Sequence, residues 1–392
     1  MRQACLLALA ALVLAAPARG ADHRIVRDRI VWSDGSRPLR LPDYATAALR
    51  SPDRRLIAVG DSGLGRLRFV DLVRRRVVFA AKADLSPLGF ATVTPLLWRR
   101  PDRVVAGSWT GDAHRTAAEG LVVVNPLRRR VVRRLRIGEA VAAPRAAGGG
   151  AVALLAAPRE RVGWARLVLA RPDGAVRQVP LRRIRAGGGR ARTRNRYPGL
   201  AVDARGRRAY VVAEGDGVAE IDLRSLHVTY HGLRGAFRGR PQGIASAPAS
   251  TGTANPSRTL GREARWLGNG LVAVTGWDSW PAAGGRERHV AAGLTLLDTR
   301  SWRTRVVDRR VSRVVYEHGL LLAERTRWSS RYRTRIGAGI AVFDREGKLL
   351  VRRFTRNSAV VLGLRGRRLR VGFFGRRRRP LVRVVRLPAA RG

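Results

Sequence analysis

The sequence predicts an all-β fold, and three observations support this prediction. Short apolar segments alternate with Pro, Gly and Asp turns along most of the chain. No window shows the i, i+3, i+4 apolar spacing of an amphipathic helix. A unit of strand, turn, strand, loop and strand recurs every ~48 residues, a period typical of the four-stranded blades of a β-propeller. We therefore predict one β-propeller domain over 21–392, with seven four-stranded blades.

The repeated unit is clearest near the start of this domain. Ser51-Pro52-Asp53 precedes the apolar strand 56–60, and the strand 67–70 ends at Asp71-Leu72. Comparable landmarks follow at Asn125, Asp173, Asp222, Asp298 and Asp344. Only the step from Asp222 to Asp298 is too long. It returns to the common period when a segment of about 235–262, rich in Gly, Ser, Pro and Thr, is treated as an insertion loop.

The unit count places blades near residues 65, 115, 160, 210, 280, 330 and 370. The last blade is short, with strands near 359–364, 369–374 and 381–385. We expect its fourth strand to come from Ile25-Val26 or Ile30-Val31-Trp32, which would close the ring. Closure removes the open sheet edges that otherwise invite aggregation.

The N-terminus predicts export. Arg2 is followed by an almost wholly apolar run, 4–16, and by Ala18-Arg19-Gly20, which is the order of a cleavable signal peptide over 1–20. No later apolar stretch approaches the ~20 residues of a membrane-spanning helix. The one cysteine, Cys5, lies inside this segment, so we expect a mature protein without disulfide, thiolate metal site or cysteine nucleophile. The expected location is secreted or extracytoplasmic, in the cell envelope, and the expected state is a monomer.

The charge balance is strongly basic. The chain has 78 Lys and Arg against 28 Asp and Glu, a net charge of +50, and all basic residues except Lys82 and Lys348 are arginine. Such an arginine skew is typical of a GC-rich coding sequence, so it is not by itself a binding site. The charge nevertheless attracts anionic polymers without sequence discrimination, in a way that salt weakens. For an exported protein the nearest polyanions are cell-envelope polymers and lipid headgroups, and we expect no specific nucleic acid.

A family resemblance follows from the turn residues. Ser51-Pro52-Asp53, a strand ending in Val59-Gly60 and a strand ending in Val70-Asp71-Leu72 resemble the YVTN-type and quinoprotein-like seven-bladed propellers, which are WD-repeat-like in rhythm. Residues 206–211 with Glu220-Ile221-Asp222 resemble the pattern again. The similarity covers most of 46–390, although the Trp-Asp ending of the strict WD-repeat class is absent at the blade ends. Such propellers include binding scaffolds, lactonases and dehydrogenases, so the resemblance does not select an activity.

A ligand site is expected on the face with the long loops. In a blade, the loop between the second and third strands shares one face with the link to the next blade, and long loops on a rigid frame usually carry recognition. Two such loops resemble each other, because each pairs Trp with Asp and places a His before the next strand. The predicted ligand-binding residues are Trp109, Asp112, His114, Asp216, Trp277, Asp278, Trp280 and His289. Asp61, Glu214, Trp328 and Tyr332 lie in other loops of the same face.

These residue types suit a sugar or a planar cation, because indole rings cover apolar faces and carboxylates fix orientation. The alternative is structural, since Trp and Asp in such loops also pack between blades or tie turns. The six histidines, His23, His114, His227, His231, His289 and His318, show no paired metal spacing. No nucleophile elbow, phosphate loop or dinucleotide fingerprint is present, so neither metal nor cofactor is predicted.

The sequence leaves three alternative functions open. The first is a binding or scaffold propeller of the cell envelope that engages a glycan, an anionic polymer or a protein through the long-loop face. The second is a propeller enzyme resembling lactonases or quinoprotein dehydrogenases, with acidic and histidine side chains at the channel mouth. Nucleic-acid binding is the third, and it rests on net charge alone.

Overall fold

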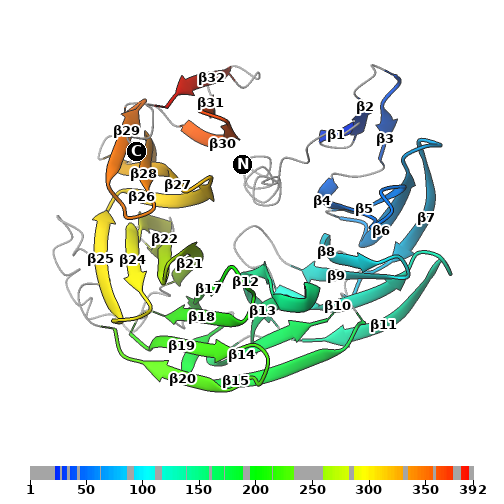
Figure 1. The fold of residues 1–392 in the computed structure, drawn as a ribbon, viewed down its shortest axis with the longest axis horizontal. Helices are drawn as coiled ribbons and strands as arrows, with labels where there is room; N and C mark the ends of the chain where they lie inside the picture. Colours follow the sequence, from blue (N-terminus) through cyan, green and yellow to red (C-terminus); the bar gives the residue numbers. More distant parts are fainter. Residues whose placement is uncertain are drawn as a thin grey trace. The chain divides into compact units, whose positions relative to one another are not determined.

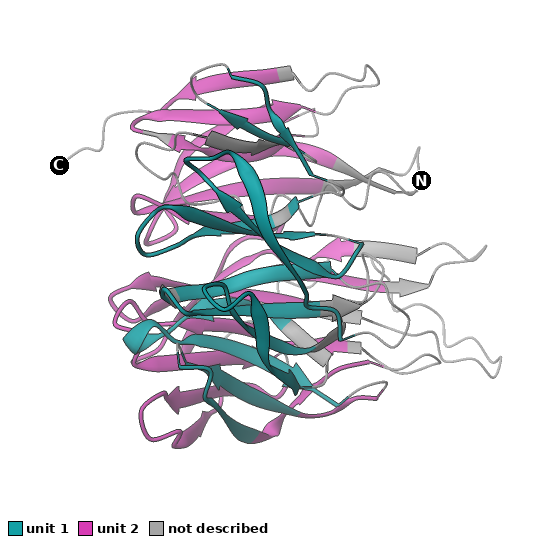
Figure 2. Ribbon diagram, turned by 90° about the vertical axis from the view of Figure 1, so that its right-hand side faces the viewer, with its two compact units in different colours: residues 1–159, 165–180 teal, residues 160–164, 181–392 magenta. Residues whose placement is uncertain are grey.

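The structure is a computed structural model, and the architecture that it describes is all-β. The described residues contain β-strands and one short 3-10 turn, Gly148–Gly150, but no α-helix. They are 23–26, 29–32, 36–41, 45–61, 63–85, 92–110, 117–137, 139–158, 161–171, 173–188, 195–213, 215–233, 259–281, 287–329, 334–355, 359–373 and 381–387. The chain divides into two compact units, 1–159 with 165–180 and 160–164 with 181–392, which Figure 2 colours separately.

The first unit contains successive antiparallel sheets that follow chain order (Figure 1). Its N-terminal sheet consists of β1 (His23–Val26), β2 (Arg29–Trp32) and β3 (Leu39–Arg40). The next comprises β4 (Ala45–Arg50), β5 (Leu56–Asp61), β6 (Arg66–Asp71) and β7 (Arg76–Lys82). A third comprises β8 (Thr92–Arg100), β9 (Arg103–Thr110), β10 (Ala117–Asn125) and β11 (Arg130–Arg136). The following sheet comprises β12 (Glu139–Ala146), β13 (Val152–Ala157), β14 (Gly163–Ala170) and β15 (Val176–Ala186), and β15 continues into the second unit.

The second unit repeats the same plan. One sheet comprises β17 (Gly199–Val202), β18 (Arg208–Ala213), β19 (Gly217–Asp222) and β20 (Val228–His231). The next comprises β21 (Thr259–Gly268), β22 (Leu271–Pro281), β24 (Leu294–Asp298) and β25 (Arg303–Asp308), with β16 (Asn195–Tyr197) parallel to β21 and β23 (Glu287–Ala291) paired to β22. The last two comprise β26 (Val311–Glu317), β27 (Leu320–Ser329), β28 (Thr334–Asp344) and β29 (Leu349–Arg353), then β30 (Ala359–Arg365), β31 (Arg368–Phe373) and β32 (Leu381–Arg386).

The predicted fold class is confirmed, because these four-stranded antiparallel sheets are those of β-propeller blades. The predicted blade centres near 65, 210, 280 and 370 fall within the spans of four different sheets, and those near 115, 160 and 330 lie outside the described residues. The N-terminal strands pair with one another, and β30–β32 forms a three-stranded sheet within the described residues. The number of blades and closure by an N-terminal strand stay predictions. Of the predicted insertion, Thr259 to Arg262 belong to β21, and the rest lies outside the described residues.

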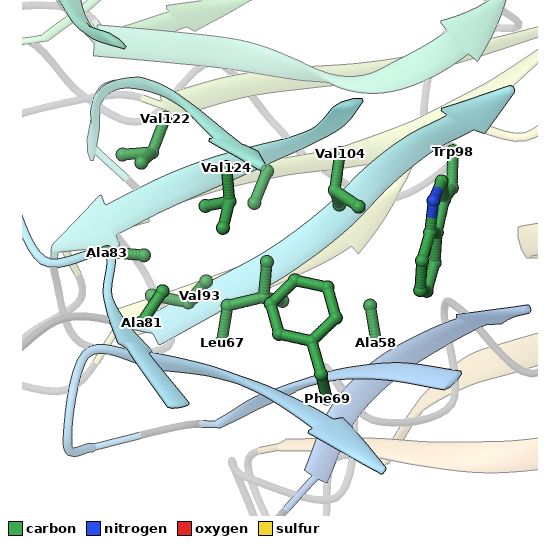
Figure 3. Packing of buried hydrophobic residues seen from close by; sticks show 11 residues of the cluster. Ala58, Leu67, Phe69, Ala81, Ala83, Val93, Trp98, Val104, Val122 and Val124 are labelled. Atoms are coloured by element: carbon green, nitrogen blue, oxygen red, sulfur yellow. The ribbon is translucent and has the colours of Figure 1, made fainter. Parts of the chain in front are cut away.

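The blade cores form because both faces of the inner strands are covered. In β5 and β6 consecutive residues are buried, unlike the alternation of a sheet with one solvent face. Figure 3 shows one such core in the first unit, where Phe69 of β6 meets Trp98 of β8. Their rings pack edge to face at 5.5 Å between centroids, and Phe69 is 1% exposed. A separate cluster packs Ile30 and Trp32 of β2 against β5 and β6.

The repeated Asp or Asn at the end of the third strand builds the next turn. Asp71 Oδ1 accepts the amide N–H groups of Val73 and Arg74, each at 2.9 Å. Asp222 and Asp298 accept turn amides in the same way, and Asn125 accepts the amide of Arg128. Asp344 instead accepts the amide of Lys348, four residues further along the chain. This Asx bonding replaces missing ladder bonds at the end of the strand. Asp173 is the exception, because β14 already ends at Ala170 and Asp173 lies within the turn, where it accepts the amide of Ala175.

Candidate functional site

In each unit, hairpins extend beyond the four-stranded pairing of their blades. In the first unit, β9 and β10 remain paired up to Thr110 and Ala117. In the second unit, β22 continues past its pairing with β24 and pairs with β23 up to Pro281 and Glu287, while β27 and β28 remain paired up to Ser329 and Thr334. Each is the connection between the second and third strands of its blade. Several residues that were predicted to lie in loops therefore lie within paired strands: Trp109, Trp277, Asp278, Trp280, His289 and Trp328.

The structure describes only part of the predicted site. Asp112, His114, Glu214 and Tyr332 lie outside the described residues. Trp109, Trp280, His289 and Trp328 are placed as backbone, in β9, β22, β23 and β27, and their side chains lie outside the description. The side chains of Asp61, Asp216, Trp277 and Asp278 are described, and each of the three carboxylates pairs with a different arginine. Convergence of the predicted set on one ligand stays a prediction.

Asp278 is held in a buried ion pair at the root of the β22–β23 hairpin. Arg262 NH1 on β21 lies 2.8 Å from Asp278 Oδ1 and also donates to the carbonyl oxygens of Gly261 at 2.7 Å and Trp277 at 3.3 Å. The two charged side chains are 2% and 6% exposed. These additional hydrogen bonds fix the positions of both side chains in the buried ion pair. Removing one partner leaves the charge of the other without compensation. The pair therefore anchors the hairpin to its blade.

Trp277 lies beside this pair and packs on glycine. A Cβ atom at Gly261 would lie 3.0 Å from Trp277 Cε2, so the absence of a side chain at 261 lets the indole lie close to β21. Gly276 has φ of +139°, and a Cβ there would lie 2.1 Å from the Gly261 carbonyl oxygen. Both glycines are therefore required by close backbone approach. Trp277 itself remains half-buried, so part of its ring is available to solvent.

The other described carboxylates of this face are also bound by arginine. Asp61 at the end of β5 accepts from Arg68 NH1 at 2.5 Å and from the Arg66 amide at 3.0 Å, and it is 3% exposed. Asp216, in the β18–β19 turn, accepts from Arg196 NH1 and from the Arg185 amide, each at 2.9 Å. Charge-assisted hydrogen bonds of this kind fix the carboxylates and the backbone around them. These residues position loops.

A charged cluster on the inner strands of the second unit could not be found from the sequence. Glu324 on β27 accepts from Arg313 NH1 on β26 at 3.4 Å and from the Val361 amide on β30 at 3.0 Å. Burial raises the pKa of the Glu324 carboxyl, and the charge of Arg313 opposes this rise. Burial also lowers the pKa of Arg265 on β21, with Glu263 opposing and Arg313 adding to that shift. Glu324 joins two neighbouring sheets, and its amide donor Val361 lies 37 residues further along the sequence.

A second cluster centres on His231, at the end of β20. Its ring stacks on Trp302 at 3.6 Å between centroids and 11° between planes, and its Nε2 lies 3.0 Å from Glu220 Oε2. Glu220 also accepts from Arg208 at 2.8 Å. Tyr210 stacks on Trp266 at 5.4 Å, and burial, followed by the charge of Glu220, raises the pKa of the Tyr210 phenol. These rings join the β17–β20 sheet to the next sheet, so we assign them to packing.

No group of three or more His, Cys, Asp or Glu side chains within the described residues could hold a metal ion. The side chains of His23, His114 and His289 fall outside this statement. The described part of the chain also contains no helix long and apolar enough to cross a membrane.

The comparisons with known proteins give no family. No protein-family model and no curated protein matches the chain. Among solved structures, BamB from Moraxella catarrhalis is 13% identical and matches 91% of this chain and 90% of its own, with a TM-score of 0.48. The β-propeller domain of Cps50 (Swd1) from Myceliophteria thermophila is 10% identical over 71% of this chain and 80% of its own, with a TM-score of 0.37. Hydrazine synthase from Kuenenia stuttgartiensis is 17% identical over 52% of this chain and 62% of its own, with a TM-score of 0.30. Likeness at this level carries no argument about activity, and the fold rests on the sheets described above.

Proposed function

We propose that this protein is an exported binding or scaffold propeller of the cell envelope, which engages a glycan, an anionic polymer or a protein through its extended hairpins. The observation that carries the proposal is the buried Arg262–Asp278 pair at the root of the β22–β23 hairpin. Asp61–Arg68 and Asp216–Arg196 form similar pairs at two shorter connections between second and third strands. Such pairs stiffen a recognition surface. A rigid frame with projecting hairpins is the arrangement that recognition loops use. The Asx turns at the blade ends support the resemblance to YVTN-type and quinoprotein-like propellers.

The contact residues in this proposal are the aromatic and polar groups of the two similar hairpins. They are Trp109, Asp112 and His114 on one hairpin, and Trp277, Trp280 and His289 on the other. Asp216 and Asp278 contribute by holding neighbouring backbone in place. Indole rings are suited to the apolar faces of sugars and to aromatic or aliphatic protein anchors.

The test is a binding measurement on immobilised neutral and acidic polysaccharides and on soluble polyphosphate, with the purified protein and tryptophan variants. We expect Trp109→Ala and Trp277→Ala to weaken binding of the retained polymer by about tenfold, as loss of an aromatic anchor does. Trp164→Ala is the matched control, because Trp164 is 48% exposed on β14 and outside the two hairpins. Thermal unfolding of each variant separates loss of binding from loss of fold.

The competing enzyme function is tested on the same protein. Metal analysis and hydrolysis of a lactone panel are measured before and after dialysis against a chelator. Stoichiometric metal together with chelator-sensitive hydrolysis would overturn the scaffold proposal. Equal polymer binding by the tryptophan variants and the Trp164→Ala control would remove the proposed hairpins from the binding surface.

A further inference from the structure

Two turns of the first unit expose a large aliphatic side chain beside three consecutive arginines. The first, here the Val73 turn, covers residues 71–76 between β6 and β7, and the second, the Leu127 turn, covers residues 125–130 between β10 and β11. Val73 is 79% exposed and Leu127 is 66% exposed, the two highest values among the described large hydrophobic residues that are exposed. The arginines that follow are Arg74, Arg75 and Arg76 in one turn and Arg128, Arg129 and Arg130 in the other.

The apolar tips are not a requirement of the turn. Val73 and Leu127 occupy the position two residues after the Asp or Asn that ends the third strand. In the second unit, the same position of the corresponding turns carries Arg224 and Arg300, both exposed. These four turns share one construction, because each has a residue with positive φ four positions after the Asp or Asn. Of the four, only those of the first unit present a Val or Leu to solvent. A single exposed apolar side chain is ordinary on a protein surface, so it is the pairing of two such tips, each followed by three arginines, that indicates an interaction surface.

In both turns, a side-chain oxygen at the end of the third strand accepts backbone amides of the turn. Asp71 Oδ1 accepts the amides of Val73 and Arg74, and Asn125 Oδ1 accepts the amide of Arg128 at 2.8 Å. The Asp71 carboxylate is therefore bound to backbone amides. The Arg75 guanidinium lies over the Trp32 ring, 5.2 Å from its centroid, and bonds Ser36. Arg74, Arg76 and the three arginines of the Leu127 turn are exposed.

The two turns belong to adjacent sheets of one unit, and each connects the third strand of its sheet to the fourth. Each follows the third strand of its sheet and leads into the outer strand, β7 or β11, which lie side by side in Figure 1. Arg134 NH2 on β11 donates to the Lys82 carbonyl oxygen at the end of β7 at 3.2 Å. Packed sheets lie about 10 Å apart, so both tips can meet one extended surface.

We propose that the Val73 and Leu127 turns form a docking surface for an anionic lipid bilayer. Arginines beside the tips are attracted to phosphate headgroups, and the aliphatic tips enter the boundary between headgroups and acyl chains. A soluble polyanion would bind the arginines equally well but offers nothing apolar for Val73 and Leu127 to enter. The bilayer therefore accounts for both features of the turns. This surface lies in the short turns and is independent of the ligand that the extended hairpins bind.

The first test is sedimentation of the full chain with vesicles of phosphatidylcholine and phosphatidylglycerol, compared with phosphatidylcholine alone. We expect the pair Val73→Ser and Leu127→Ser to lower partitioning onto the anionic vesicles by about tenfold, because the apolar contribution is lost while the net charge is unchanged. Val384→Ser is the matched control, since Val384 is also exposed, at 59%, on β32 of the second unit. An equal loss in this control would assign the effect to general hydrophobicity and overturn the proposal.

The second test concerns charge. The pair Arg74→Gln and Arg128→Gln is expected to weaken anionic-vesicle binding by about tenfold at low salt. The pair Arg224→Gln and Arg300→Gln removes the same charge from turns without an apolar tip. We expect it to lower the logarithm of the partition coefficient by less than half as much as the first pair does. Both pairs are also measured on soluble heparin. If the serine pair leaves vesicle binding unchanged while both glutamine pairs weaken heparin and vesicles alike, a polyanion surface replaces the lipid proposal.

The third test reads the position of the tips directly and is unaffected by other membrane contacts of the chain. Cys5 is the one cysteine, so Cys5→Ser combined with Val73→Cys or Leu127→Cys gives one labelling position. An environment-sensitive dye at either position is expected to shift to the blue on anionic vesicles. The same dye at Arg224→Cys is expected to keep its aqueous spectrum. An aqueous spectrum at both tips on vesicles that have bound the protein would overturn the proposal.

Discussion

At the scale of single residues, many of the described acidic side chains have one of two structural tasks. One group, including Asp71, Asp222 and Asp344, accepts turn amides at the ends of strands. A second group accepts from buried or half-buried arginines, as Asp61 and Asp278 do. An ion pair that buries one arginine with one carboxylate removes one charge of each sign, so the excess of 78 basic over 28 acidic residues remains among the other charged groups.

The Arg262–Asp278 pair gives a prediction about stability. Asp278→Val is expected to destabilise the protein by about 3 kcal/mol, because the 2% exposed Arg262 side chain keeps its charge in a buried place without its partner. Replacing both residues, Arg262→Met with Asp278→Val, is expected to cost much less than the sum of the single changes. Urea unfolding of the four proteins measures the coupling. Additive single effects would show that the two side chains act independently.

The buried Glu324 carboxyl gives a prediction about pH. Its pKa is raised by burial, so the folded state binds its proton more tightly than the unfolded chain does. The stability contributed by this difference is complete below the ordinary glutamate pKa of 4.5 and is lost as pH rises through the raised value. Glu324→Gln removes this titration while keeping an acceptor for the Val361 amide. The stability of Glu324→Gln relative to the parent should therefore increase as pH rises above 4.5.

Thermal unfolding at a series of pH values checks this expectation. The control is Glu346→Gln, because Glu346 is 60% exposed on a turn of the same unit. A difference between Glu324→Gln and the parent that stays constant with pH would show that the carboxyl does not change its proton affinity on folding. Loss of the ion pair with Arg313 acts in the opposite direction in this comparison, because Arg313 attracts only the ionised carboxylate and so opposes the rise in its pKa.

At the scale of elements, the turns decide where the blades begin and end. Two first-to-second-strand turns use two residues with positive φ, Asn269-Gly270 at +50° and +79° and His318-Gly319 at +51° and +78°. Both angles positive is the geometry of a type I′ hairpin turn, for which Asn-Gly is the preferred pair. His318 is therefore a less favourable residue in a position that the homologous turn gives to asparagine.

His318→Asn is expected to stabilise the protein by about 0.5 kcal/mol, and Asn269→His to destabilise it by a similar amount. Gly319→Ala is the control with backbone strain, because alanine is less stable than glycine at positive φ and its Cβ would make no compensating contact. Urea midpoints of the three variants at one pH measure these effects. If His318→Asn and Asn269→His both stabilise or both destabilise the protein, backbone preference does not determine the turn residue. Side-chain contacts would then determine it.

The strand pattern was predictable because it is local. Turn residues such as Ser51, Asp71 and Asp222 mark strand ends within a few positions, and the structure places them at those ends. The partners of the site residues were not predictable in the same way. The Arg262–Asp278 pair depends on the register between β21 and β22, and Glu324 meets the Val361 amide from a different sheet. Such contacts require bulge positions and sheet packing, which a single sequence does not contain.

At the scale of the whole molecule, the net charge of +50 is the dominant property. Described ion pairs such as Asp61–Arg68 and Asp278–Arg262 are buried and therefore screened little by salt. Most of the remaining guanidinium groups repel one another through solvent, and this repulsion favours the unfolded chain, in which the charges lie farther apart. Added salt thus weakens a destabilising interaction more than a stabilising one.

We therefore expect thermal unfolding to shift upward by several degrees as sodium chloride increases from low ionic strength to about 0.5 M, where the Debye length falls below ~5 Å. Scanning calorimetry at fixed pH measures the shift, and a sucrose series of equal osmolality separates screening from exclusion of the cosolvent. The pair Arg224→Gln and Arg300→Gln removes two exposed charges of the second unit, so it should raise stability at low salt and lose that advantage at high salt. A midpoint that falls as salt rises would mean that solvent-exposed attractions outweigh the repulsion among the arginines. In that case the excess charge would be organised into stabilising networks instead of being left open to anionic partners.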